Sequence, residues 1–548
     1  MNMNHFFSDT KLKNVDFSSF NTQNVNNMSY MFYKCFDETK KINLTSYNTE
    51  IVLDMSHMFD SSNFIEIDLS SFNTINVKDM SYMFNDCYDL TKIILLSFDT
   101  KNVCDMSNMF YNCEKLTSID LSTFNTINVK NMSRMFNRCN LSSLNISTFN
   151  TKNVTNMSYM FCLFKYLDNS KLDISFFDTK NVINMSNMFS YSNLSKFNLP
   201  TFDTKNVSDM RKIFYFSKNL SSSNLNLTNF NTEKVINMSY MFANTDIEEI
   251  NLSSFNTKKL EDMSYMFSNC KKLKKIDLSN FNADNILDMS HLFDGCELIE
   301  NALLSFKTKN IKNLNYMFND CKKLVEINLS TFITENLTDM KYMFYNCEKL
   351  KNINLSSFNF QNVIYLEFAF YNCKNLSNIN IFSFNALNVE ELRYIFYNCN
   401  NLENIDLSFF NTEKVTNMKY MFYNCKKLAI LDLSSFNTRN VEDMSYMFYE
   451  CNNLREVNLS SFNINKVDNM SYMFNQFTKL RKINLSSFAF RDGINIFQMF
   501  YGCHRLTEID LPFFDFVNNN NLCNIIFGFN KIIKQEIDGN SMVKIKLI

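Results

Sequence analysis

Apolar residues recur along this chain with a period of 25 to 28 residues. The marker of each copy is an apolar residue, usually Met, followed by Phe, as in Met447-Phe448. A period of this length is typical of stacked units, none of which can bury its apolar face alone. The pattern predicts a solenoid of about twenty coils over residues 12–527, with an N-terminal cap at 1–11 and a C-terminal cap or tail at 528–548. The marker phenylalanines are Phe32, Phe59, Phe84, Phe110, Phe136, Phe161, Phe189, Phe214, Phe242, Phe267, Phe293, Phe318, Phe344, Phe370, Phe396, Phe422, Phe448, Phe474, Phe500 and Phe527.

Each copy divides into three pieces, of which the first two predict a strand and a turn. Apolar residues such as Val457 and Leu459 alternate with polar ones, which predicts a short β-strand. The second piece reads Ser-Ser-Phe-Asn-Thr-x-Asn-Val, and its Asn and Thr side chains can bond nearby backbone groups and hold a turn. Turns of this kind are needed because the 548 residues include only 5 Gly and 2 Pro.

The third piece predicts a short helix, because its apolar residues are spaced by three and four positions. In the copy around Met447 they are Val441, Met444, Met447, Phe448, Cys451 and Leu454. The residue before the Cys is often Asn, Asp or Gly, as at Asn346, Asp320 and Gly295. These residue types tolerate the left-handed conformation that ends a helix. The expected fold class is an α/β repeat with a parallel sheet on one face and short helices or helical turns on the other.

Composition and charge exclude several classes of protein. Hydrophobic residues make up 46% of the chain, which argues against a disordered polymer. Lys and Arg number 54 against 56 Asp and Glu, and there is no polybasic block, so neither nucleic acid nor an anionic membrane surface is an expected partner. No stretch reaches the roughly 18 apolar residues of a membrane helix, so membrane insertion is not expected. The first residues show no apolar stretch of signal-peptide length, which leaves the location open.

The unit FNTRNVEDMSYMFYECNNLREVNLSSF resembles the BspA-like leucine-rich repeats and the related mycoplasma lipoprotein-associated repeat. The family pattern pairs Met-Phe and Cys with a following Leu-x-x-Ile-x-Leu-Ser strand, and the resemblance covers about residues 12–527. It implies a leucine-rich-repeat solenoid with its parallel sheet on the concave side. It also implies a surface or secreted protein that binds other proteins, often in adhesion or host contact.

Thirteen of the sixteen cysteines lie three residues after a marker Phe, and eight successive copies from Cys270 to Cys451 carry one each. No His accompanies them, and spacings near 26 are not a metal-ligand signature. Disulfides between neighbouring coils are an alternative. Ser or Thr replaces the Cys singly, however, at Ser62, Ser192, Ser217 and Thr245. The pattern favours a column of buried free thiols that act as small hydrophobes.

Asn or Asp stands between the last two apolar residues of the strand in eighteen of twenty copies. Alternation turns these side chains away from the core. They can form a polar binding surface, or a solubilising ladder whose members bond their neighbours, and the ladder is favoured for most copies. Beside them lies a column of residues whose charge varies between copies. Such variation is expected of positions that set binding specificity, and it is equally expected of unconstrained surface. The candidate binding face comprises Asp277, Asn328, Asn354, Asp406, Asp432, Asn458, Lys275, Glu326, Glu456 and Lys482.

Tyrosines beside the marker Phe, such as Tyr446 and Tyr449, are a further candidate. Tyr is a frequent interface anchor. The same residues can equally pack between coils, and the sequence leaves both alternatives open.

Catalysis finds no support in the sequence. The four histidines are scattered, and neither a Gly-rich phosphate loop nor a nucleophile elbow is present. The expected function is non-catalytic binding of a protein, from a host or a cell surface, or of a glycan through the concave sheet, without cofactor or metal. The alternative is an intracellular structural scaffold for protein–protein interaction.

Overall fold

The computed structural model describes residues 1–13, 15–38, 40–164, 172–195, 199–220, 225–304, 306–381, 387–491 and 493–512, and the backbone of 533–538 and 542–547. These residues form a parallel-sheet β-solenoid of about 17 turns, where about twenty coils were predicted. The last predicted copy, with Phe527, and part of the predicted C-terminal cap lie outside the described residues. The chain divides into two compact units, Met1–Leu260 and Glu261–Ile548.

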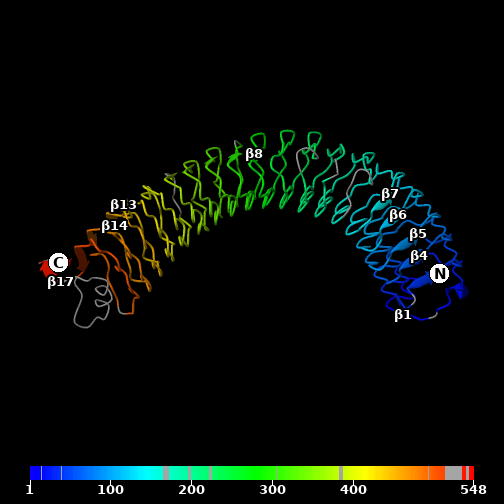
Figure 1. The fold of residues 1–548 in the computed structure, drawn as a ribbon, viewed down its shortest axis with the longest axis horizontal. Coiled ribbons are helices and arrows are strands. Elements are labelled where there is room, and N and C mark those ends of the chain that lie inside the picture. Colours follow the sequence, from blue (N-terminus) through cyan, green and yellow to red (C-terminus); the bar gives the residue numbers. More distant parts are fainter. Residues whose placement is uncertain are drawn as a thin grey trace. The chain divides into compact units, whose positions relative to one another are not determined.

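The strands are short and most coils contribute one, but within the described residues none is assigned between Asn145 and Lys275 or between Asn380 and Ile430 (Figure 1). In the first unit they are β1 (Lys11–Leu12), β2 (Phe36–Asp37), β3 (Lys41–Asn43), β4 (Glu66–Asp68), β5 (Lys92–Ile94), β6 (Ser118–Asp120) and β7 (Ser143–Asn145). In the second unit they are β8 (Lys275–Asp277), β9 (Asn301–Leu303), β10 (Glu326–Asn328), β11 (Asn352–Asn354), β12 (Asn378–Asn380), β13 (Ile430–Asp432), β14 (Glu456–Asn458), β15 (Lys482–Asn484), β16 (Glu508–Pro512), β17 (Ile533–Asp538) and β18 (Met542–Leu547).

Strands pair in parallel with the residue one coil further along, so Asn328 lies beside Asn354 and Asn354 beside Asn380. The largest sheet runs β12-β11-β10-β9-β8. In β10 and β11 the central Ile is buried and the flanking residues are exposed, as the alternation predicts. At the C-terminal end of the second unit β18 pairs antiparallel with both β16 and β17.

The core consists of columns in which equivalent residues of successive coils lie on one another. The marker Phe448 is fully buried and stacks on Phe422 and Phe474, with ring centroids 5.8 and 5.7 Å apart. Met444, Met447 and Cys451 are equally buried. Every coil therefore buries its apolar face against its two neighbours, which is why one copy cannot fold alone.

The third piece of the copy is not a helix, and this prediction was wrong. Within the described residues the structure assigns one helix, the short 3₁₀ turn Phe17–Ser19. In the copy around Met447, Tyr446 and Glu450 have φ values of 57° and 58°, and two left-handed residues four positions apart are incompatible with an α-helix.

Tight turns and bonds to the next coil replace the helix. The N–H groups of Met447 and Cys451 donate to the carbonyl three residues earlier, at 3.3 and 3.1 Å. The N–H groups of Tyr446 and Phe448 donate instead to carbonyls of the next coil, at 2.9 and 3.0 Å. Backbone bonds thus alternate between the coil and its neighbour. Successive turns of this kind bury residues at the same steps of three and four as a helix does, which is why the apolar spacing did not distinguish them.

The predicted left-handed position before the Cys is confirmed. Asn346, Asp320, Gly295 and Gly502 have φ values of 58°, 54°, 72° and 80°. The position closes a tight turn rather than a helix.

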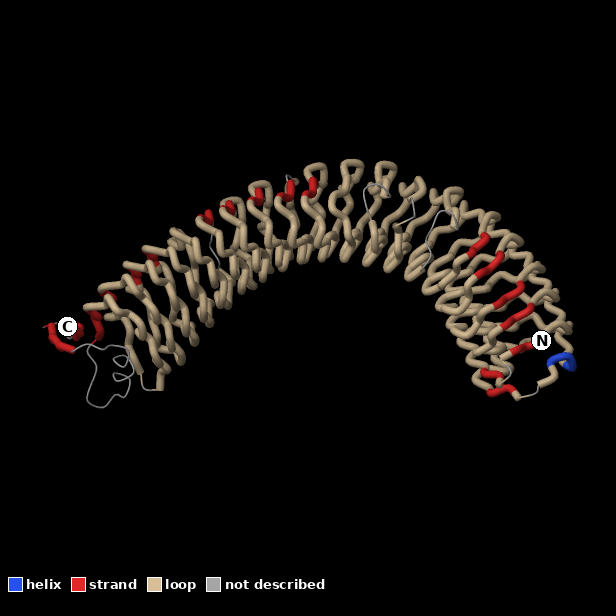
Figure 2. Tube along the Cα trace, in the orientation of Figure 1, coloured by secondary structure: helices blue, strands red, loops and turns tan. Residues whose placement is uncertain are grey.

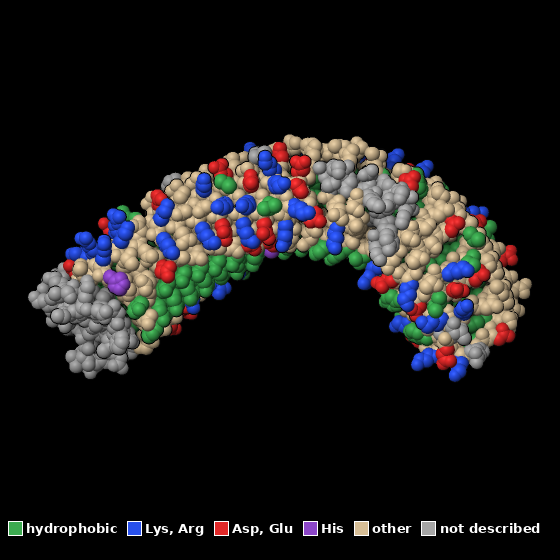
Figure 3. All heavy atoms as spheres, in the orientation of Figure 1, with side chains coloured by type: hydrophobic (Ala, Val, Ile, Leu, Met, Phe, Trp, Pro, Cys, Tyr) green, Lys and Arg blue, Asp and Glu red, His purple; other side chains and the backbone are tan. Residues whose placement is uncertain are grey.

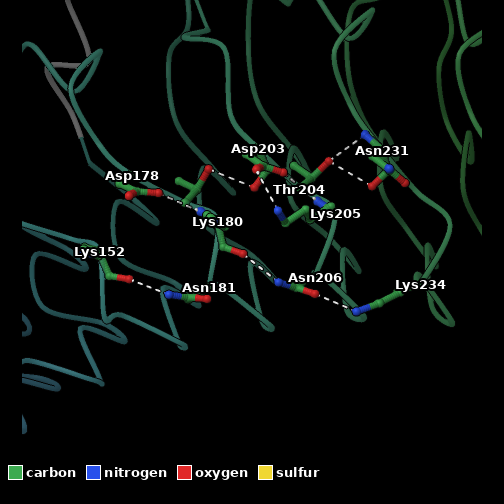
Figure 4. A network of polar contacts seen from close by, with 11 residues as sticks. Lys152, Asp178, Lys180, Asn181, Asp203, Thr204, Lys205, Asn206, Asn231 and Lys234 are labelled. Carbon is green, nitrogen blue, oxygen red and sulfur yellow. Dashed lines mark hydrogen bonds and ion pairs between the residues drawn. The ribbon is translucent and has the colours of Figure 1, made fainter.

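The predicted Asn/Thr turn is also confirmed, and it joins coils as well (Figure 4). The Asp203 carboxylate accepts the N–H two residues further on, at 3.1 Å. The Thr204 hydroxyl donates to the carbonyl of Asn231 in the next coil at 2.9 Å and accepts the Asn231 N–H at 2.8 Å. The Asn206 side chain donates to the Lys180 carbonyl of the preceding coil at 2.8 Å. Hydrogen bonds from side chains to backbone groups therefore hold this turn, in place of the Gly and Pro residues that usually shape turns.

In the second unit the distance between successive coils differs from one face of the solenoid to the other. Ring centroids of equivalent residues in successive coils measure that spacing locally. It is 4.4 to 4.8 Å for the tyrosines beside the marker Phe, from Tyr316 to Tyr472. It is 5.3 to 5.8 Å for the marker Phe and 5.5 to 6.5 Å for the Phe that follows the strand.

The coils of this unit therefore converge on the tyrosine side and diverge on the strand side. Strands β8–β12 accordingly follow the outer edge of the unit (Figure 2). The resemblance implied a sheet on the concave side, and for the second unit that expectation was wrong, because the stacked aromatic rings bring the coils closest together on the opposite face.

Candidate binding surfaces

The ten residues of the predicted binding face all lie in the second unit, and all are exposed. Four of them, Glu326, Asn328, Asn354 and Asp406, line one groove of about 550 Å³ over β10–β12. The groove is completed by Ile327, Asn352, Ile353, Asn378, Ile379, Asn380 and Ile381. Its floor is apolar and its walls are amide and carboxylate groups, so it can hold an extended polar ligand.

A second hollow, of about 730 Å³, lies on β14–β16 and takes in two more of the predicted residues, Glu456 and Lys482. Its other lining residues are Arg455, Val457, Lys479, Arg481, Asn484, Arg505 and Asp510. We call it the basic hollow. The remaining predicted residues, Lys275, Asp277, Asp432 and Asn458, belong to neither cavity.

Most of the Asn/Asp column holds the turn that follows each strand. Asp406 and Asp432 accept the N–H of the Ser two residues further on, at 3.0 and 2.9 Å, and Asn458 does so at 3.2 Å. Hydrogen bonds from Ser408 keep the pKa of Asp406 below its usual value. These contacts give the column a structural role in the turn of its own coil, whereas the sequence suggested a ladder of bonds between neighbouring copies.

The cysteine column makes hydrogen bonds along the stack. The Cys451 thiol donates to the carbonyl oxygen of Phe422 in the preceding coil at 3.1 Å. Ser192 and Ser217, which replace Cys, donate to the equivalent Phe carbonyls at 2.9 and 2.7 Å. Burial raises the pKa of the Cys451 thiol to about 12. A buried hydroxyl makes the same bond at Ser192 and Ser217, so the thiol acts in this column as a small hydrogen-bond donor rather than as a reactive group.

The tyrosines form the most continuous surface feature of the second unit. Two columns of stacked rings run along its inner edge, where Figure 3 shows an unbroken apolar band. We call them the aromatic stripe. It comprises Tyr316, Tyr342, Phe368, Tyr394, Tyr420, Tyr446 and Tyr472 in one column and Tyr345, Tyr371, Tyr397, Tyr423 and Tyr449 in the other.

Stacking makes this stripe rigid while leaving it accessible. Neighbouring rings of a column are tilted by only 3° to 17°, and every ring is partly exposed. Partial burial raises the pKa of Tyr316 and Tyr420 to about 12. The sequence left anchoring and packing between coils as alternatives, and the structure shows that these rings pack between coils and also face solvent.

A ladder of amides borders the stripe. The Asn372 side chain donates to Asn346 at 2.8 Å, and Asn424 donates to Asn398 at 2.7 Å. The polar border and the aromatic band together resemble the polar rim and apolar centre of protein interfaces.

The profile of the family described as "Mycoplasma protein of unknown function, DUF285" matches residues 1–118, 90–199, 162–276, 262–381, 347–457 and 427–539. These matches span nearly the whole chain. The chain belongs to this family.

Solved structures show a distant likeness to this DUF285 chain. The chain in the structure titled "Crystal structure of TLR13-ssRNA13 complex" is 16% identical, with 80% of this chain and 70% of that chain covered and a TM-score of 0.16. The functional domain of InlJ from Listeria monocytogenes, which includes a cysteine ladder, is 11% identical, with coverages of 88% and 85% and a TM-score of 0.17. A chain of the Toll–Spätzle complex of Drosophila is 12% identical, with coverages of 85% and 57% and a TM-score of 0.16. TM-scores this low support no argument about the function of this chain.

No curated protein matches the DUF285 chain. The described residues contain no cluster of three or more His, Cys, Asp or Glu side chains that could hold a metal ion. His57 and His291 each meet one carboxylate, of Asp60 and Asp294, at 2.6 and 2.7 Å. Within the same described part of the chain, no helix is long and apolar enough to cross a membrane.

Proposed function

We propose that this DUF285 chain is a non-catalytic binding solenoid that holds a partner protein through the aromatic stripe of its second unit. The observation that carries the proposal is the continuity of the stripe, with twelve partly exposed aromatic rings in two adjacent columns. No step of this function needs a cofactor or a metal.

The stripe has the properties of an interface centre. Tyr is enriched among residues that dominate binding energy, because its ring offers a large apolar area and its hydroxyl a hydrogen bond. Rings already held by their neighbours lose little conformational entropy when a partner binds. The seven rings of the longer column, 4.4 to 4.7 Å apart, span roughly 28 Å, which suits a standard protein interface.

The resemblance to BspA-like repeats supports an adhesive role at the cell surface or in secreted form. The alternative is an intracellular scaffold that uses the same stripe. Protease treatment of intact cells distinguishes them. A surface protein is cleaved while a cytoplasmic control enzyme survives, and a chain that stays intact under these conditions contradicts the adhesive role.

The stripe itself is tested by crosslinking followed by binding measurements. A photoreactive residue replaces Tyr397 in one sample and the exposed Phe409, outside the stripe, in another. We expect crosslinks to a partner from position 397 and none from position 409. The identified partner, once purified, should bind Tyr397→Ala/Tyr423→Ala about 30-fold more weakly than the unaltered chain in calorimetry.

The matched control is Phe409→Ala/Ile430→Ala, which removes two exposed apolar side chains outside the stripe. We expect it to bind the partner as the unaltered chain does. Equal losses in both variants, or crosslinks from position 409 alone, would contradict the proposal.

A further inference from the structure

Positive charge is concentrated in the basic hollow, although the chain as a whole is close to neutral. Five of its nine lining residues are cations, although the whole chain carries a formal net charge of -2. The five are Arg455, Lys479, Arg481, Lys482 and Arg505. Figure 3 shows Lys and Arg side chains gathered at this end of the second unit.

The repeat places these cations side by side. Arg455 and Arg481 occupy the same slot of consecutive coils, and Lys479 and Arg505 occupy another. Equivalent backbone positions lie roughly 5 Å apart, so each pair places like charges close together. Repulsion of this kind destabilises the unliganded protein slightly, and an anion between the side chains relieves it.

Most of this charge is not neutralised by the protein. Lys482 pairs with Glu508 at 2.8 Å, and the Lys479 ammonium donates to the Asn453 side chain at 2.6 Å. Among the residues that the structure describes, Arg455, Arg481 and Arg505 form no ion pair. Three exposed guanidinium groups therefore remain available to a ligand, each able to grip a sulfate or a carboxylate with two parallel hydrogen bonds.

The other lining groups select the class of anion. Glu456, Asn484 and Asp510 offer oxygen acceptors in the same hollow. Carboxylates and amide oxygens accept hydrogen bonds from hydroxyl groups. The lining includes no aromatic residue on which a nucleobase could stack, although stacking is usual in single-strand nucleic-acid sites. A ligand that carries both anionic groups and hydroxyls fits this set.

We infer that the basic hollow binds an acidic oligosaccharide, one that carries sulfate or carboxylate groups beside free hydroxyls. The volume of about 730 Å³ accommodates a few sugar units. The guanidinium groups of Arg455, Arg481 and Arg505 hold the anionic groups, and Glu456 and Asp510 accept hydrogen bonds from hydroxyls. This site is separate from the aromatic stripe and does not depend on the function proposed for it.

The test uses the full chain and a fluorescent heparin hexasaccharide. We expect saturable binding that weakens as salt rises from about 50 to about 200 mM, since sulfate contacts release counterions. Arg455→Gln/Arg481→Gln should raise the Kd at least about 10-fold. Both side chains are exposed, so the melting temperature should not change; if it does, Arg505→Gln provides a second variant with the same expected direction.

The control is Lys349→Gln/Lys351→Gln, which removes two exposed cations from the slots of Lys479 and Arg481, five coils earlier. It should change the Kd less than about two-fold. Uncharged maltohexaose should not bind, and Tyr397→Ala/Tyr423→Ala should bind heparin normally. Absence of heparin binding, equal losses in the control, or equally tight binding of single-stranded oligothymidine or of phosphatidylserine vesicles would overturn the inference.

Discussion

The two units share one backbone but differ along the slot two residues before the marker Phe. In the second unit this slot holds aromatic residues from Tyr316 to Tyr472, which stack without interruption. In the first unit the tyrosines of this slot are interrupted by His57, Asn108, Arg134, Asn187 and Lys212. The φ values are nevertheless 56° to 59° in the first unit from Tyr30 to Tyr240, and 54° to 62° in the second from Tyr265 to Tyr472.

The left-handed conformation at this slot therefore comes from the buried columns on either side and not from the residue that occupies it. A backbone held in this way leaves the outward side chain free to vary. Where cations occupy the slot they lie over rings, as Arg134 does over Tyr159, 4.6 Å from the ring centroid. The comparison indicates that the core maintains the fold in both units, whereas the stripe is a particular feature of the second.

The largest expected effect tests whether the two cores are equivalent. Phe110→Ala in the first unit and Phe448→Ala in the second each remove a fully buried ring from the marker column. Each should lower the free energy of unfolding by about 3–5 kcal/mol, because a large cavity remains between coils. Urea unfolding, with hydrogen exchange to identify the affected unit, measures both. If one substitution lowered the free energy of unfolding by less than half as much as the other, the two cores would not be equivalent.

The next effect concerns the donor slot that both units share. Cys451→Ala and Ser217→Ala remove donors to the carbonyls of Phe422 and Phe189, and each should cost about 1–2 kcal/mol. Cys451→Ser keeps the donor and should cost less than about 1 kcal/mol. Urea midpoints at a constant m-value test this order. If Ser at position 451 were as costly as Ala, packing of the sulfur rather than hydrogen bonding would explain the column.

A pH effect should report the partial burial of the stripe tyrosines. Burial raises the pKa of Tyr316 and Tyr420 to about 12, above the value of about 10 for an unfolded chain. Because these folded-state pKa values are raised, the corresponding stability is fully present below about pH 10 and is lost as pH rises towards about 12. Tyrosinate absorbance should show a late-titrating group that Tyr420→Phe diminishes. Complete titration of the tyrosines near pH 10 would contradict the burial of the stripe.

The smallest effect tests whether the stripe slot is independent of the fold. Arg134→Tyr in the first unit replaces a cation–π contact with a ring stacked on Tyr159. The two contacts are similar in size, so the stability should change by no more than about 0.5 kcal/mol. Thermal unfolding measures the difference, with unaltered protein as the reference. A loss of about 2 kcal/mol or more would mean that this slot helps to specify the fold.

The sequence alone determined the features that repeat within one copy. The short strand, the Asn/Thr turn and the left-handed position at Asn346 and its equivalents follow from local residue chemistry, and the period is read from their recurrence. Such chemistry acts between near neighbours in the chain and is therefore visible in a single copy. The ten predicted face residues are also exposed as expected, because strand alternation assigns the face directly.

Only the tertiary structure decided what neighbouring coils do to one another. Helix and tight turns bury residues at the same spacing, and the choice between them depends on carbonyls of the next coil, such as that of Ser471. Which face is concave depends on unequal coil spacing, and the groove and the basic hollow each need residues from several coils. These properties arise between residues about 26 positions apart, where contacts are set by stacking and leave no local pattern to read.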